Sequence, residues 1–427
     1  MSSLIPNWNR DGLASVRKID RFEIYKQIAH GGSGTIHVGI IAEIAGKIRN
    51  GTLDVGMLDG TATEEQCSQK KASYTPDSLK RYGLVAIKVY FCSSDGRRAF
   101  EAEREFYQSL TLNLKSVLKD DSSDAKISAN FPALLGSAKD PIKVKHFIGG
   151  KEVVDERMWT AIEVIHGISL RTLHLCFSRQ GEEDGMIEIA DSVLRPGKLG
   201  QLPRHYLIPI PVIYHIFLEL ATSLKYMHEI LGWAHSDIKK DNVMIREQRA
   251  DPHGGYPDIV LIDFGTAKKL SDNPKMGFEI GPSAFKHARQ KDAKDLADMI
   301  VDLSKDHSRC GNHDECILHK TEVECRDHST LFIQDCGHHD DGWEKFFNQM
   351  AFYRGHDDAS ISAFLDEFEQ LADEKRISSN SRDHNFDCIL EAATNVDIKR
   401  HGIANNEIGH AISKAGLSRQ SDWVNQS

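Results

Sequence analysis

Residues 235–242 read HSDIKKDN, and residues 261–265 read LIDFG. Each segment stands at the edge of a short apolar run, and together they supply two carboxylates and an amide, Asp237, Asp263 and Asn242. Mg²⁺ prefers hard oxygen ligands of this kind and keeps phosphate and water in the rest of its shell. We therefore expect Asn242 and Asp263 to hold Mg²⁺. The order and spacing of the two segments carry this prediction, because a lone Asp-Phe-Gly occurs by chance.

Two further side chains of residues 235–242 fit a phosphoryl transfer. Asp237 is the expected catalytic base, since its carboxylate can accept or orient the proton of an attacking hydroxyl. Lys239 is the expected neutraliser of charge that develops on the transferred group.

A glycine cluster, HGGSG at residues 30–34, lies between two segments of alternating apolar and polar residues. Glycine lets a backbone approach phosphate oxygens closely, and bare N–H groups can bind an anion. A plain hairpin is the commoner explanation of a glycine cluster between two strands. It is not a Walker A loop, because no Gly-Lys-Ser/Thr follows.

Lys88 stands inside the apolar strand VAIK at residues 85–88. A lysine in such a place either reaches water from a sheet edge or is paired, since burying it alone is costly. The following helix offers three acids, and we favour Glu103 as the partner because its neighbours Phe106 and Tyr107 would face a core. Glu101 and Glu105 then belong to a solvated face.

The periodicity of apolar residues predicts a strand-rich first part and a helix-rich second part, hence an α+β fold with two lobes. The expected strands are a strand–turn–strand unit within 21–39 and strands at 84–91, 159–165, 243–245 and 259–262. The expected helices are 97–118, 211–231, 291–304, 342–353, 359–375 and 385–396.

Composition narrows the function classes. The 427 residues carry 53 Lys and Arg against 63 Asp and Glu, a formal net charge of -10, and no basic run of five. We expect no binding to nucleic acid and no membrane association, because both need basic or long apolar segments. The first residues lack a secretory signal, so an intracellular protein, cytoplasmic or nuclear, is expected.

Taken together, these motifs resemble the protein kinase superfamily, whose glycine-rich loop, Val-Ala-Ile-Lys strand, catalytic loop and Asp-Phe-Gly occur here in order over roughly residues 22–303. The resemblance implies an enzyme that uses ATP and Mg²⁺ on a protein substrate, and Lys239 is more similar to Ser/Thr kinases than to tyrosine kinases. It implies that Lys88, paired with Glu103, contacts the α- and β-phosphates.

The resemblance also implies a set of nucleotide-binding and anchoring positions. Gly31 and Gly34 would cover the phosphates, Ile162 would be the gatekeeper, and residues 163–165, including Glu163 and Ile165, would form the hinge that binds adenine. Asp292 would anchor the catalytic loop. The adenine pocket would be lined by Ile28, Ile36, Ala86, Met244 and Ile245.

The resemblance implies one kinase-like domain with extensions. The predicted organisation is an N-terminal extension at 1–20, a domain at 21–375 with lobes 21–165 and 166–375, insertions at 42–82 and 178–204, and a tail at 376–427.

Four departures from the family pattern put regulation and substrate in doubt. Ala29 replaces the first glycine of the loop, and Ser236 replaces an arginine that reads a phosphorylated activation loop. No Ala-Pro-Glu follows Gly265, so the peptide-docking platform is reduced or rebuilt. The two insertions are also unusual and give the chain a faint similarity to divergent, fungal-type kinase-like proteins.

Residues 310–339 gather four of the eight cysteines and five of the 21 histidines. Their spacing permits a tetrahedral Zn²⁺ site, although no paired C-x₂-C occurs, and ordinary packed cysteines are the alternative. The candidate ligands are Cys310, Cys316, Cys325 and Cys336 with His313, His319, His328 and His338.

Three functions remain open at this point. An active Ser/Thr protein kinase leads, because all five of Lys88, Glu103, Asp237, Asn242 and Asp263 are present. A pseudokinase that serves as a nucleotide-binding scaffold is the first alternative, and a small-molecule kinase is the second. The physiological substrate, the regulator and the oligomeric state are not encoded in these motifs.

Overall fold

The computed structural model describes residues 18–49, 84–117, 130–148, 151–165, 167–177, 208, 210–246, 256–304 and 341–378. These residues form two compact units, and helices and strands are mixed as in the α+β class. The first unit comprises residues up to Gln108 together with Pro132–Val164. The second comprises Ser109–Phe131 and continues from Ile165, so the change of unit falls inside the expected hinge.

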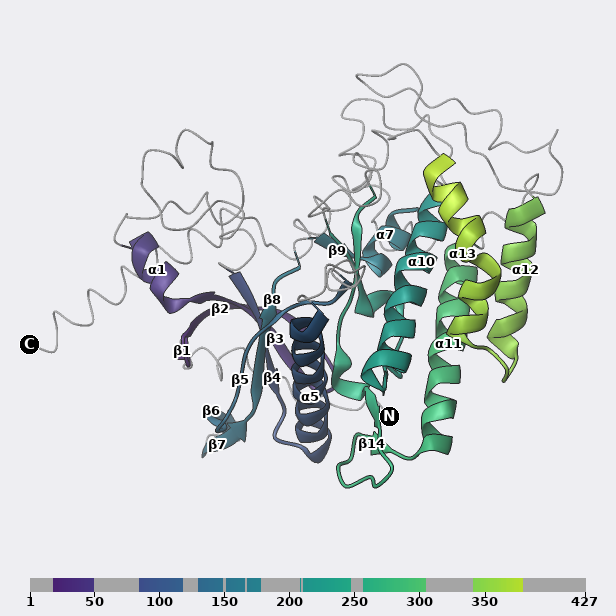
Figure 1. Ribbon diagram of the computed structural model, residues 1–427. Coiled ribbons are helices and arrows are strands. Elements are labelled where there is room, and N and C mark those ends of the chain that lie inside the picture. Colours follow the sequence, from purple (N-terminus) through teal and green to yellow (C-terminus); the bar gives the residue numbers. More distant parts are fainter. Residues whose placement is uncertain are drawn as a thin grey trace, which may run out of the picture. The chain divides into compact units, whose positions relative to one another are not determined.

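The first unit is built on a six-stranded antiparallel sheet with strand order β1-β2-β3-β4-β8-β5 (Figure 1). The strand bounds are β1 (Lys18–Ile19), β2 (Phe22–His30), β3 (Gly34–Ile41), β4 (Leu84–Tyr90), β8 (Trp159–Glu163) and β5 (Leu134–Ser137). Helix α5 (Ser94–Val117) follows β4 and contributes its residues up to Gln108 to this unit. The predicted strand–turn–strand unit, the strand near 84–91 and the helix near 97–118 are confirmed.

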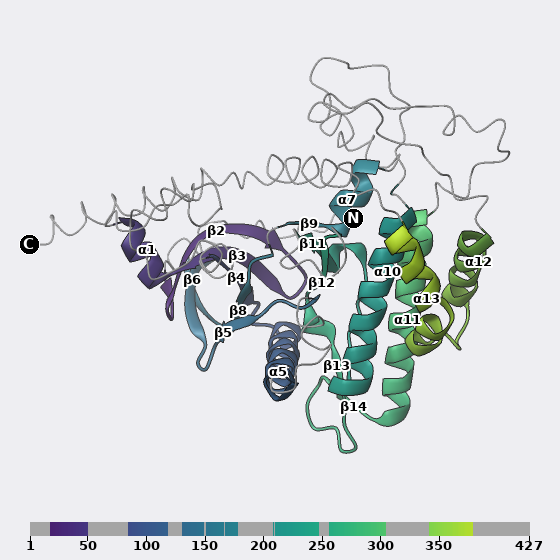
Figure 2. The same cartoon turned by 45° about the horizontal axis from the view of Figure 1, so that its top comes forward.

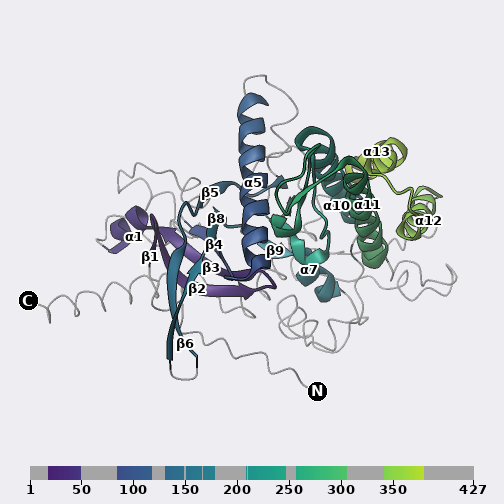
Figure 3. The ribbon, with the colours of Figure 1, turned by 90° about the horizontal axis from the view of Figure 1, so that it is seen from below.

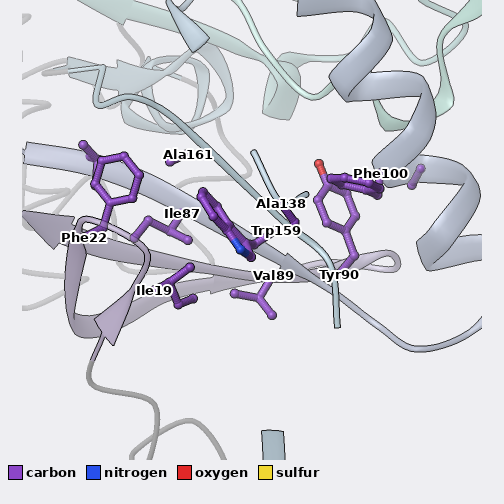
Figure 4. Close-up of a cluster of buried hydrophobic side chains, with 11 residues drawn as sticks. Ile19, Phe22, Ile87, Val89, Tyr90, Phe100, Ala138, Trp159 and Ala161 are labelled. Carbon is purple, nitrogen blue, oxygen red and sulfur yellow. The ribbon is translucent and has the colours of Figure 1, made fainter. Parts of the chain in front are cut away.

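Alternation along β4 separates the core from the candidate site. Val85, Ile87 and Val89 are completely buried in a cluster with Phe22 and Trp159, which Figure 4 shows in close-up. Successive strand residues point to opposite faces, so Ala86 and Lys88 occupy the other face. The hydrophobic cluster thus fixes which way the lysine points.

Three features of the first unit differ from the sequence-based expectation. The end of the extension expected at 1–20 belongs to the folded domain, because Ile19 in β1 pairs with Phe22 and is 1% exposed. The insertion at 42–82 begins with a helix, α1 (Ala42–Arg49), and its remainder from residue 50 lies outside the described residues. The hairpin of β6 (Ile142–Ile148) and β7 (Lys151–Arg157) was not predicted; Figure 3 shows it extending from the sheet.

The second unit is mainly helical. Its helices are α7 (Leu170–Phe177), α10 (Ile210–Lys225), α11 (Pro282–Ser304), α12 (Asp341–Gly355) and α13 (Ile361–Ser378). Helices α10, α11, α12 and α13 run beside one another in both Figures 1 and 2. Helix α10 is apolar on nearly all sides, as expected of a helix that is surrounded by others.

Short strands of the second unit carry the expected active-site motifs. One three-stranded sheet has the order β12-β11-β9 and another has the order β10-β13-β14. Their bounds are β9 (Gly167–Ser169), β10 (Trp233–Ala234), β11 (Val243–Arg246), β12 (Asp258–Leu261), β13 (Lys268–Leu270) and β14 (Glu279–Ile280). Helical turns lie at Tyr226–Leu231, Lys240–Asn242 and Phe264–Thr266.

Several predicted helix bounds in this unit need correction. The helix expected at 211–231 changes at Tyr226 into a π-helical turn that ends at Gly232, whose φ of 68° suits glycine. Helix α11 begins at Pro282 rather than at 291, because its polar first turns hid the apolar periodicity; proline is favoured in a first helical turn. Helix α13 continues past 375 to Ser378. The helix expected at 385–396 lies outside the described residues.

Every helix in the described part of the chain is too short or too polar to cross a lipid bilayer.

The buried His37 on β3 makes the first unit sensitive to acid. Burial, reinforced by the nearby Arg157, lowers the pKa of His37 from 6.5 to about 4, and its Nε2 lies 2.9 Å from Oγ1 of Thr35. Between these two pKa values the unfolded chain binds a proton that the folded unit does not, so stability falls as the pH drops from 6.5 toward 4.

We predict a loss of up to about 3 kcal/mol across this pH window, which His37→Gln removes. The measurement is the opening free energy of β3 and β4 from amide hydrogen exchange at several pH values. An equal pH dependence in the wild type and in His37→Gln would contradict the assignment.

Candidate active site

Lys88 and Glu103 form a buried ion pair in the first unit. Nζ of Lys88 lies 2.8 Å from Oε2 of Glu103, and the two residues are 8% and 1% exposed. Strand β4 supplies the lysine and helix α5 supplies the acid. Of the two interpretations of Lys88, the paired one therefore applies, and Glu103 is the partner, as the apolar neighbours in α5 suggested.

Two residues that the sequence analysis missed hold this pair in place. The hydroxyl of Tyr90 donates to Oε2 of Glu103 at 2.8 Å and lies 3.0 Å from Oγ1 of Thr160. The ring of Tyr90 also lies 5.2 Å from Nζ of Lys88, within cation–π range. A signal was present, because Tyr90 follows Lys88 by two residues and so shares its face of the strand.

The expected nucleotide-contacting side chains of the sheet share one face. Residues directly opposite in paired strands lie on the same side. Lys88 pairs with Ile36 on β3, and Ala86 pairs with Ile162 on β8. Since Ala86 and Lys88 are two residues apart, all four side chains occur on the face opposite Val85, Ile87 and Val89. This face is partly apolar and carries one buried cation.

The glycine cluster forms a tight turn between β2 and β3. The N–H of Gly31 donates to the carbonyl of Gly34 at 2.9 Å, so this donor is used within the turn. A Cβ on Gly34 would lie 2.3 Å from the carbonyl oxygen of Val89. Gly34 is therefore required by the packing of β3 against β4. A Cβ on Gly32 would meet nothing within 4 Å.

The remaining cofactor positions lie at the ends of strands. Ile28, at a register shift between β2 and β3, is half-buried. Glu163 ends β8, is 1% exposed, and accepts a hydrogen bond from the N–H of Ala133 at 3.2 Å. Ile165 is half-buried and is the first residue after the change of unit. Thus the side chain of Glu163 has a structural partner, and a hinge role would fall to its backbone.

In the second unit, a buried carboxylate holds the start of the expected catalytic loop. Asp292 on α11 is 0% exposed and accepts three hydrogen bonds. The donors are the N–H of Ser236 at 2.6 Å, the N–H of His235 at 2.7 Å and Nε2 of His228 at 2.9 Å. An ionised carboxylate in such a place is tolerated only when it is satisfied by donors. The anchoring position expected for Asp292 thus has a physical basis.

His235 is a buried, neutral imidazole that forms hydrogen bonds on both sides of its ring. Its Nε2 donates to the carbonyl of Ile262 at 3.1 Å, and its Nδ1 accepts from the N–H of Asp237 at 3.3 Å. Complete burial lowers the pKa of His235, whereas the charge of Asp292 acts in the opposite direction. The imidazole edge also packs on Phe264, with ring centroids 5.1 Å apart. His235 therefore connects the HSDIKKDN and LIDFG segments.

The side chains of Asp237, Lys239 and Asn242 form one cluster. Nζ of Lys239 donates to Oδ2 of Asp237 at 2.6 Å. Nδ2 of Asn242 donates to Oδ2 of Asp237 at 3.0 Å and to its carbonyl oxygen at 2.9 Å. Because both amide hydrogens of Asn242 point to Asp237, the amide oxygen is oriented to accept. Asp237 remains accessible, with a side chain 32% exposed.

Asp263 lies at the same end of the β11–β12 hairpin as Asn242. Val243 pairs with Leu261, and the N–H of Ile262 donates to the carbonyl of Asn242 at 2.9 Å. Asp263 follows directly with φ 64°, and its Oδ1 accepts from the N–H of Gly265 at 3.4 Å. The hairpin register thus brings a carboxylate and an amide oxygen to one end, and such hard oxygens suit Mg²⁺.

The predicted zinc site cannot be placed on the structure, because all eight candidate ligands lie outside the described residues. Within the described ranges, no three His, Cys, Asp or Glu side chains are grouped so that they would hold a metal ion.

The segment that follows LIDFG is short, and backbone hydrogen bonds join its two ends. The N–H groups of Lys269 and Ser271 donate to the carbonyls of Phe278 and Ile280 at 2.9 and 3.0 Å. Phe278 stacks on Trp233 with ring centroids 5.7 Å apart. Strands β13 and β14 pair in parallel, and helix α11 begins two residues after β14, so the chain passes directly from this segment into the helix that carries Asp292.

The comparisons agree with this geometry. Residues 155–287 match the family model of the protein kinase domain, a range that contains β8, the catalytic-loop cluster and Asp263. No curated protein matches the chain. The match supports membership in the protein kinase superfamily and, at a coarse level, phosphoryl transfer as the class of activity.

Ser236 provides a stability test of the loop. Its φ is 68°, a conformation that disfavours residues with a Cβ, and its buried Oγ has no hydrogen-bond partner in the described part of the chain. We predict that Ser236→Gly stabilises the second unit by about 1 kcal/mol, since glycine accepts this φ and an orphaned hydroxyl is removed.

Urea unfolding of the full chain measures this gain. Ser236→Ala is the matched control, because it removes only the hydroxyl and keeps the Cβ, so a smaller gain is expected. A Ser236→Gly variant that unfolds at lower urea than the wild type would refute the explanation.

Proposed function

We propose that this chain is a Mg²⁺- and ATP-dependent protein kinase that phosphorylates Ser or Thr hydroxyls. The proposal rests on one observation above all. Asp237 is a half-exposed carboxylate whose Oδ2 accepts hydrogen bonds from both an amide and an ammonium, those of Asn242 and Lys239. A general base needs such access together with a fixed direction.

The chain's own groups have separable roles in this proposal. Mg²⁺, when bound, would neutralise phosphate charge and orient the phosphates for in-line transfer. Asn242 and Asp263 would hold it through their side-chain oxygens. Lys88, aimed by Glu103, would contact the α- and β-phosphates. Asp237 would orient the acceptor hydroxyl and receive its proton.

Regulation by phosphorylation of the segment after LIDFG is not part of the proposal. Ser236 occupies the position where the family has a phosphate-reading arginine, so a charge-assisted bond to a phosphate has no donor there. The segment is already held by backbone hydrogen bonds and by the stacking of Phe278 on Trp233. We infer an enzyme whose segment is ordered without modification.

Asp263→Ala is the direct test of the metal role. We predict that transfer of ³²P from Mg·ATP to a protein or peptide acceptor falls at least about a hundredfold. The reason is that Mg²⁺, which would neutralise the phosphate charge, loses one of its protein ligands. Circular dichroism should stay unchanged. Asp366→Ala, which removes an exposed carboxylate on α13, is the matched control and should keep full activity.

Lys88→Met gives a second arm of the same experiment. It should lower transfer while Asp237 and Asn242 keep their contacts. Normal turnover in Asp263→Ala would refute the metal assignment. ATP binding without transfer to any acceptor in the wild type would favour the pseudokinase alternative.

A small-molecule acceptor is the second candidate, and the short segment favours it. Between Gly265 and Pro282, the N–H groups of Lys269 and Ser271 donate to carbonyls of the same segment. The N–H of Leu270 donates to the carbonyl of Gly232 at 2.9 Å. An extended peptide would have to bind elsewhere. Assaying peptide libraries and metabolite pools in parallel with the same preparation separates the two: incorporation into metabolites alone would replace the protein-kinase proposal.

A further inference from the structure

Lys240 and Asp241 stand inside the catalytic loop but point away from its cluster. Nζ of Lys240 donates both to Oδ2 of Asp302 on α11 and to Nδ1 of His174 on α7. Because the ammonium donates to Nδ1, that nitrogen of His174 is an unprotonated acceptor. The three side chains are 21%, 25% and 13% exposed in the order Lys240, Asp302, His174. This is a partly desolvated contact between a loop and two helices.

A second contact joins the same elements. Nη1 of Arg171 lies 3.2 Å from Oδ1 of Asp241, with side chains 55% and 48% exposed. Pairs this exposed contribute little to stability. Arg171 and His174 are three residues apart on α7, so they share a face of that helix. The Lys240 contact, being less exposed, is the stronger of the two.

The position of Lys240 in the loop gives the contact a consequence for the site. Lys240 begins the helical turn Lys240–Asn242, which closes when the N–H of Asn242 donates to the carbonyl of Lys239 at 2.9 Å. Lys239 and Asn242 are the two residues that bind Asp237. Fixing Lys240 therefore restrains the backbone turn that carries both partners of Asp237.

Helix α11 then holds the loop at two points. Asp292 binds its beginning at His235 and Ser236, and Asp302 binds its end at Lys240. Ten residues separate the two carboxylates, which corresponds to about 15 Å along a helix axis. A single rigid element thus sets the distance between the ends of the loop.

We propose that Asp302 is a positioning residue for the transfer reaction, acting through Lys240 with His174 as the second acceptor. The proposal rests on the proposed function in naming transfer as the step that depends on loop geometry. Asp302 touches neither nucleotide nor acceptor in this account, and its effect is to keep Asp237 and Asn242 aligned.

The test compares Asp302→Asn, Lys240→Met and the double variant with the wild-type full chain. Each single variant should lower kcat about tenfold or more while KM for ATP changes little, since small misplacements of reacting groups are costly. The double variant should be no slower than either single one, because both remove the same contact. Lys240→Arg, which can still donate to both acceptors, should recover most of the activity.

Hydrogen exchange supplies a readout that needs no turnover. The amide of Asn242 and its neighbours at 237–242 should exchange at least about fivefold faster in Asp302→Asn, since local opening raises exchange. Glu367→Gln, which breaks the exposed pair with Lys345, is the control and should change neither measurement.

The outcomes separate this inference from the proposed function. A wild type without transfer, combined with faster exchange in Asp302→Asn, would overturn the proposed function and support loop positioning. An active wild type with unchanged kcat and exchange in Asp302→Asn would overturn the positioning role. Strictly additive losses in the double variant would also overturn it.

Discussion

The carboxylate of Asp292 is the contact on which the second unit depends. It is fully buried, and three N–H donors satisfy it, two from the backbone at His235 and Ser236 and one from His228. A buried charge without partners would be strongly destabilising, so the loop must take the path that presents both backbone donors. That path forces Ser236 to a positive φ and turns Asp237 toward its ammonium and amide partners. Ser236 thus takes a strained backbone conformation, and the side chain of the next residue, Asp237, is held in a fixed direction.

The first unit also buries a charged group that needs partners, but here the group is a cation, Lys88, instead of a carboxylate. Lys88 is held among apolar strands, and its cost is offset by Glu103, which in turn is held by Tyr90. The hydrophobic cluster on the opposite face decides the direction of Lys88, because alternation leaves it no other side. Both units thus place one costly polar group in a buried position and satisfy it with partners distant in sequence. Such groups specify a geometry more than they add stability.

The sequence predicted those features of the site that show in local patterns of apolar and charged residues. Lys88 in an apolar run demanded a partner, and the apolar periodicity of the following helix indicated Glu103. The strands next to Asn242 and Asp263 were visible as two short apolar runs, although their pairing was not predicted. The hydrogen bond of Tyr90 to Glu103 and the ion pair of Asp302 with Lys240 could not be predicted in this way. They depend on strand register and helix packing, which no local pattern encodes. The β6–β7 hairpin was missed although its strands alternate, and the start of α11 was missed because its first turns are polar.

Phosphoryl transfer through Asp237 is the central claim, and Asp237→Asn tests it most directly. The asparagine keeps the size of the side chain and an oxygen that can still accept hydrogen bonds, as Asp237 accepts from Lys239 and Asn242. The account predicts that Mg·ATP binding, followed by calorimetry, is retained while γ-phosphoryl transfer in a single-turnover assay falls by a factor of about 10² to 10⁴, the usual contribution of a general base. Transfer at the wild-type rate in Asp237→Asn would contradict it.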